Sequence, residues 1–97
     1  MTDINAEETA EEIEFLRTTP IETVVASHIF RLIQVAAVHL ASTPPQLAEA
    51  RLSIDVVAAI IQAGDERLGE HLDLYRNALA EVQQVYVRAA ALPSTTL

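Results

Sequence analysis

The stretch TPIETVVASHIFRLIQVAAVHLASTPPQ, residues 19–46, contains the same helix-start signal twice. In each copy a Thr precedes a Pro, and a Glu or Gln lies three residues after the Thr. A threonine side chain can cap the first backbone N–H groups of a helix, and proline is tolerated in the first turn, where the N–H has no intrahelical partner. The two signals therefore predict one helix over residues 20–41 and the start of another at residue 44.

The rest of the chain continues this helical pattern. Apolar residues recur at steps of three and four over residues 44–68 and again over residues 71–91, and no segment alternates as a strand does. Gly69 is a good candidate to end the first of these segments, and Pro93 to end the second. Helices joined by such short links pack as antiparallel neighbours. We therefore predict an all-α fold of three antiparallel helices, over 20–41, 44–68 and 71–91.

These signals divide the chain into three parts. Residues 1–18 form an acidic segment, residues 19–92 the helical bundle domain, and residues 93–97 a flexible tail. The acidic segment holds six of the fourteen Asp and Glu residues. Two alternatives stay open for it, a short helix over 6–16 or disorder, because it has few apolar groups to offset the entropy of ordering. The acidity and the scattered arginines argue against nucleic-acid binding.

The chain has more apolar residues than its length can enclose. It is 97 residues long and 51% hydrophobic, and so short a chain buries only about 60–65% of its unfolded surface. Residues 20–41 carry apolar side chains over half their circumference, so we expect this helix to be central. We predict a homodimer that completes a six-helix bundle; the alternative is a well-packed, alanine-rich monomer. The predicted interface residues are Val24, Phe30, Val35, Val38, Leu52, Val56 and Ile60.

Residues 21–41 are also long and apolar enough to cross a bilayer. However, Arg31 lies in the middle of this window, where it costs about 2.5–3.5 kcal/mol on insertion scales, and Glu22 and Gln34 add to that cost. We therefore expect a helix buried in a soluble protein and no membrane partner. The acidic start lacks an early apolar run, so we expect no signal peptide. The cysteine-free composition fits a reducing cytoplasm.

The sequence contains no recognisable catalytic, cofactor or metal motif. His28 and His39 lie on similar sides of the predicted helix but about 16 Å apart along its axis, too far to bind one metal ion. There is no cysteine, and two glycines cannot form a phosphate-binding loop. We therefore expect no catalytic residue, no cofactor and no metal, and we expect that the protein is not an enzyme.

Three segments resemble a known family. They are VVASHIFRLIQVAAVHLA at residues 24–41, LAEARLSIDVVAAII at residues 47–61 and ALAEVQQVYVRAA at residues 78–90. Together they resemble the small bacterial helical family known as domain of unknown function 1844. That family has no established activity, so the resemblance implies a helical, cytoplasmic, non-enzymatic protein and assigns no site residues.

These observations favour an interaction module. We expect the protein to act as a homodimer that binds a further protein through its helical surface or through the acidic N-terminal segment. The alternative is a binder of a small apolar ligand between the helices.

Overall fold

The computed structural model describes the backbone of residues 2–92 and the side chains of residues 9–92. Within these residues it contains four α-helices, one 3-10 helix and no strand, which confirms the predicted all-α fold. The elements are α1 (Thr2–Thr18), α2 (Ile21–Ala41), α3 (Leu47–Gly64), the 3-10 helix η1 (Asp65–Leu68) and α4 (Leu72–Ala91). The predicted bounds of α2 and α4 are right to within one residue. The predicted helix stop at Pro93 and the predicted tail 93–97 lie outside the described residues.

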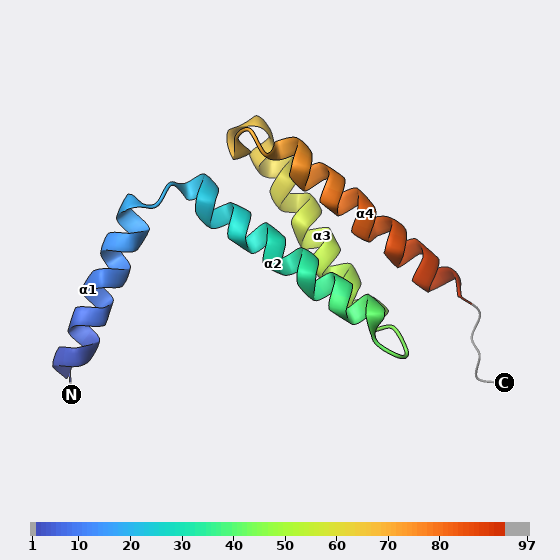
Figure 1. The fold of residues 1–97 in the computed structure, drawn as a ribbon, viewed down its shortest axis with the longest axis horizontal. Coiled ribbons are helices and arrows are strands. Elements are labelled where there is room, and N and C mark those ends of the chain that lie inside the picture. The colour runs from blue at the N-terminus through green and yellow to red at the C-terminus, as the bar shows by residue number, and fades with distance from the viewer. Residues whose placement is uncertain (1, 93–97) are drawn as a thin grey trace.

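Helices α2, α3 and α4 pack as a three-helix bundle in which α3 runs antiparallel to both α2 and α4, so α2 and α4 are parallel (Figure 1). Their buried apolar side chains form two clusters along the bundle. One lies near the η1 end and contains Ile29, Val57, Ile61, Leu68, Leu72 and Tyr75. The other lies near the α2–α3 loop and contains Ala36, Leu40, Ala50, Ile54 and Val82. The core-facing apolar residues of α3, namely Ala50, Ile54, Val57 and Ile61, follow one another at steps of four, three and four, as the predicted periodicity requires.

Both predicted threonine caps are wrong. Pro20 is the N-cap of α2, its carbonyl accepts the N–H groups of Thr23 and Val24, and no side chain caps the helix. Helix α3 begins at Leu47 rather than at residue 44, with Gln46 as its N-cap. Proline disfavours the helical conformation in the residue before it, so two successive prolines delay the start of the helix. The Gln46 N–H donates instead to His39 O at 2.9 Å, which closes the loop against the end of α2.

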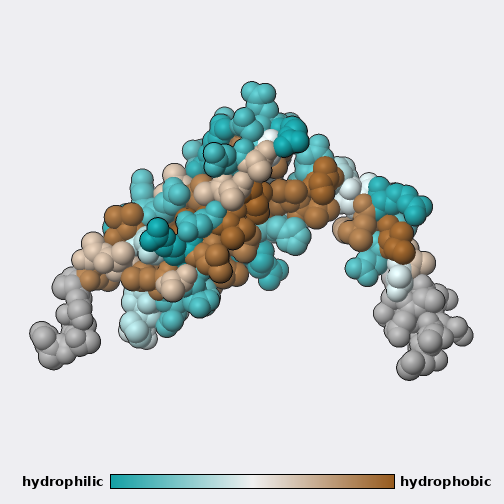
Figure 2. All heavy atoms as spheres, turned by 180° about the vertical axis from the view of Figure 1, so that it is seen from behind, coloured by the Kyte–Doolittle hydropathy of each residue, from teal (hydrophilic) through white to brown (hydrophobic). Residues whose placement is uncertain are grey.

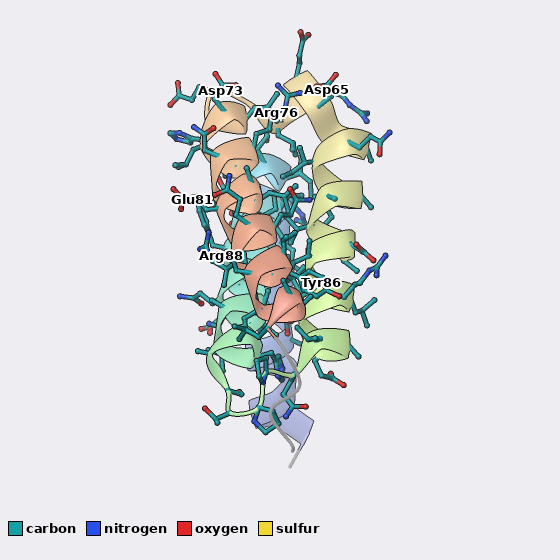
Figure 3. The ribbon with its side chains drawn as sticks, turned by 90° about the vertical axis from the view of Figure 1, so that its right-hand side faces the viewer. Asp65, Asp73, Arg76, Glu81, Tyr86 and Arg88 are labelled. Atoms are coloured by element: carbon teal, nitrogen blue, oxygen red, sulfur yellow. The ribbon has the colours of Figure 1, made fainter. Side chains whose placement is uncertain are left out.

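The predicted helix 44–68 is also interrupted near its end. Helix α3 stops at Gly64, and Asp65 has a φ of 47°, which breaks the helical path before η1 begins. At the end of η1, Gly69 adopts a φ of 95°, in agreement with its predicted role as a helix stop. Arg76 of α4 reaches back to this corner, and its Nη2 lies 2.8 Å from Asp65 Oδ1 (Figure 3). The pair links the corner to α4, although both side chains are half exposed.

Helix α2 is not central, contrary to expectation. Its buried residues are Ile29, Ala36 and Leu40, whereas α3 has five buried residues. In a bundle of three helices each helix has only two neighbours, so none of them can be enclosed on all sides. The broad apolar surface of α2 is therefore only partly covered by its own chain.

The acidic N-terminal segment forms α1, a helix longer than the predicted 6–16. It makes no contact with any other element of the described chain and extends away from the bundle (Figure 1). The radius of gyration is accordingly 17.7 Å, compared with about 12.5 Å for a compact domain of this length.

Gly64 provides a test of the α3–η1 corner. Replacing a helical Gly by Ala normally stabilises a protein by up to ~1 kcal/mol. A Cβ at position 64 would lie 2.6 Å from both Cγ and Cδ2 of Leu68, and Leu68 is buried and cannot move away freely. We expect Gly64→Ala to destabilise the protein by about 1–3 kcal/mol in a denaturant titration.

The matched control is the double variant with Leu68→Ala. Once the Leu68 side chain is removed, Gly64→Ala should become neutral or stabilising relative to Leu68→Ala alone. If Gly64→Ala stabilises the protein with Leu68 present, the close packing at this corner is wrong.

Candidate interaction surface

Helix α4 covers only one side of the α2–α3 pair. On α2, Phe30 packs edge-on against Tyr75 of α4, with ring centroids 5.6 Å apart. On α3, Ile54 lies beside Gln83 and Tyr86 of α4. These contacts fix which flank of each helix is covered, and the opposite flanks have no neighbour within the described chain.

The uncovered flanks carry five apolar side chains of the predicted interface. Val24 and Val35 lie about 120–140° around α2 from Phe30, and Leu52 and Val56 lie about 160° around α3 from Ile54, at 100° per residue. Ile60 is partly buried against the core and borders the same side. We call this surface the open face; it consists of these five residues together with Ala59 and Ala63, which are exposed on the same side of α3.

The α3 part of the open face has the spacing of a coiled-coil seam. Leu52, Val56, Ala59 and Ala63 are all exposed and follow one another at steps of four, three and four. This is the step pattern by which a helix presents one continuous stripe to a partner helix. Leu52 is 66% exposed and Val56 38%. A band of apolar side chains crosses the bundle on the face shown in Figure 2.

The other two predicted interface residues lie apart from the open face. Phe30 is on the opposite flank of α2, against Tyr75. Val38 is exposed on the outer surface of α2, next to Val35 but farther from α3. The spacing of four, three and four residues between Leu52, Val56, Ala59 and Ala63 is the signal that could have placed the two alanines, rather than Phe30, in the predicted interface.

Charged groups border the open face on both sides. On α3, Arg51 Nε lies 3.7 Å from Asp55 Oδ2, an exposed ion pair between residues one turn apart. On α2, Arg31 is exposed and makes no salt bridge with any side chain that the structure describes. The α2 border therefore carries a positive charge that is not balanced by a neighbour.

A shallow hollow of about 510 Å³ lies on the outer surface of α2. Its lining consists of Arg31, Gln34, Val35, Ala37, Val38 and His39. The lining is a single helix surface and is open to solvent. A second hollow, about 270 Å³, lies between α3 and α4 and is smaller than the roughly 300–1,000 Å³ of typical ligand pockets.

The described side chains form no group of three or more His, Asp or Glu residues that could hold a metal ion. His28 is exposed and His39 half-buried, both on α2. Helix α2 is long and apolar enough to cross a membrane by length and composition, and 17% of this window is buried in the structure. In the structure one face of α2 packs against α3 and α4.

Comparisons of the chain with protein-family models, with curated proteins and with solved structures found no match.

The orientation of α3 can be tested with two substitutions two residues apart. Ile54 is 6% exposed and Leu52 is 66% exposed. We expect Ile54→Gln to cost about 3 kcal/mol of unfolding free energy or more, because it buries an amide in the core, whereas Leu52→Gln should stay within ~0.5 kcal/mol. The measurement is chemical denaturation in dilute solution. Equal losses for the two variants would mean that α3 is rotated about its axis.

Proposed function

We propose that this protein is a non-enzymatic interaction module that acts as a homodimer, joined through the open face. The observation that carries the proposal is the apolar flank of α2 and α3 that α4 leaves uncovered. Apolar surface of this kind, with charged residues at its border, marks contact sites on soluble proteins. A second copy of the chain presents the same surface and can cover it.

The exposed area of the chain supports this proposal. The chain exposes 7299 Å², whereas a monomeric protein of its size exposes about 5,500 Å². The projecting helix α1 accounts for part of the difference. A standard interface buries about 800 Å² on each partner, so coverage of the open face by a second copy would remove part of this surplus.

The seam of α3 favours an antiparallel, two-fold arrangement. Its larger residues, Leu52 and Val56, are at one end, and its alanines are at the other. An antiparallel pair of α3 helices would set Leu52 opposite Ala63 of the partner and Val56 opposite Ala59. Large residues then meet small ones along the whole seam, as in well-packed helix interfaces. With α2 and α4 of each copy outside, the product is a six-helix bundle.

A cytoplasmic location and a further protein partner are part of this proposal. The cysteine-free composition supports the first. The resemblance to the bacterial family of unknown function stays a prediction.

Val56→Glu and Ile60→Glu test the proposed interface. In a two-fold dimer each substitution places two carboxylates in an apolar contact, where they cannot be solvated. We expect each to raise the dimer dissociation constant at least about tenfold, or ~1.4 kcal/mol. The measurement is light scattering over a hundredfold range of protein concentration.

Val87→Glu is the matched control, because Val87 is exposed at 63% on α4, away from the open face. It should leave the dissociation constant unchanged, and all three variants should keep the helical circular dichroism signal. A Val56→Glu protein that stays dimeric at micromolar concentration would exclude the open face as the interface.

A further inference from the structure

Helix α1 is a helix without a packing partner in its own chain. It spans Thr2–Thr18 and makes no contact with any other described element. Its apolar side chains Ile13, Phe15 and Leu16 are 48%, 60% and 57% exposed. Most of the stability of a helix in a protein comes from packing of an apolar face, and a single helix of this length in water is marginal. A surface that receives α1 would therefore stabilise it.

The hollow on the outer surface of α2 has the right chemistry to receive α1. Its apolar floor is formed by Val35, Ala37 and Val38, and Arg31 and His39 line it. No acidic residue lies in this lining. Val35 also belongs to the open face, so the hollow and the proposed dimer interface are continuous.

The charges of the two surfaces are complementary. Residues 2–18 contain six acidic residues and one arginine. Of the described acidic side chains on α1, only Glu14 is paired, with Arg17 at 3.7 Å, which leaves Glu11 and Glu12 without a basic neighbour. Arg31 at the hollow lacks an acidic one. Opposite charges at a contact fix its register and speed association.

The junction between α1 and α2 favours docking onto another copy over docking onto the same chain. The Thr19 N–H still donates to Phe15 O at 2.9 Å, so the last turn of α1 runs up to the junction. Pro20 follows directly, in an extended conformation with φ −56° and ψ 139°. Proline fixes its own φ and keeps Thr19 out of the helical region. The short, stiff linker of Thr19 and Pro20 therefore holds α1 away from α2 of the same chain.

We infer that α1 of each subunit docks into the hollow on α2 of a second copy of the chain, so that the two subunits exchange their N-terminal helices. Ile13 and Leu16, one turn apart, pack on the floor formed by Val35 and Val38, and the acidic side chains of α1 face Arg31. This inference rests on the proposed homodimer and adds a second, reciprocal contact beside the open face.

Site-directed cross-linking tests the exchange, because the natural chain has no cysteine. Ala10→Cys places a thiol near the middle of α1, and Ala37→Cys places one in the hollow. The full-length variants, one with a size tag, are mixed and treated with a bismaleimide whose span is about the width of a helix, ~10 Å. We expect a heterodimeric product on a denaturing gel, with a yield that falls at high salt because the charges are screened.

Two matched variants sharpen the result. Ala80→Cys, on the exposed outer side of α4, replaces Ala37→Cys and should give a severalfold lower yield. Arg31→Glu in the Ala37→Cys chain should lower the yield severalfold, and Arg31→Lys should largely restore it.

The outcomes separate this inference from the proposed function. If the wild-type chain is dimeric by light scattering but Ala10→Cys cross-links no better to Ala37→Cys than to Ala80→Cys, helix exchange is wrong and the homodimer stands. A chain carrying both Ala10→Cys and Ala37→Cys that cross-links only within itself would show that α1 folds onto its own α2, which also overturns the exchange. A chain that is monomeric over the whole concentration range overturns both.

Discussion

The packing of α2 against α3 around Ile29 and Val57 is the contact on which the rest of the structure depends. Both side chains are fully buried, and among the described residues they are the largest with that degree of burial. They belong to the cluster that also takes in Leu72 and Tyr75 from α4. Once α2 and α3 are joined along this line, α4 can close only one side of the pair. On the other side Leu52 and Val56 are left exposed, and Val24, Val35 and Ile60 half-buried, by this geometry rather than by any local feature.

This geometry explains how a short chain can be rich in apolar residues and still leave many of them exposed. Helix α3 carries one apolar stripe toward α2 and α4 and a second toward solvent, with Arg51 and Asp55 between them on the α4 side. A fourth helix in the same chain would cover the second stripe. Helix α1 is the only other helix in the described chain, and it extends away from the bundle with a strongly acidic composition. A surface that covers this second stripe would therefore come from outside the subunit, and a second copy is the source that we propose.

Much of the fold could be predicted from the sequence because helical periodicity is a strong local signal. The apolar face of α4, the buried stripe of α3 and the stop at Gly69 were all readable in this way. The start of α3 could not be predicted in this way. A threonine followed by two prolines resembles a helix start, but the prolines together disfavour the helical conformation in the backbone before them and so delay the helix. The break at Gly64 and Asp65 could not be predicted either, since it depends on how Leu68 packs back onto the corner.

For the candidate surface, periodicity identified Leu52, Val56 and Ile60. It could not separate Phe30 from Val35, because both flank the buried stripe and only the position of α4 decides which flank is covered.

The order of residues along the α3 seam bears on whether the partner is another copy or a different protein. The large residues of the seam are at one end of α3 and its alanines are at the other. Two copies of the seam are therefore complementary only when the two α3 helices pack antiparallel. In the parallel direction Leu52 would face Leu52 and Ala63 would face Ala63, so the helices would be held apart at one end and leave a gap at the other. A two-fold axis across α3 imposes the antiparallel direction without any further contact.

The same axis requires that every contact from one subunit to the other also occurs in the reverse direction. If α1 docks across the interface, it must therefore do so twice, once on each subunit.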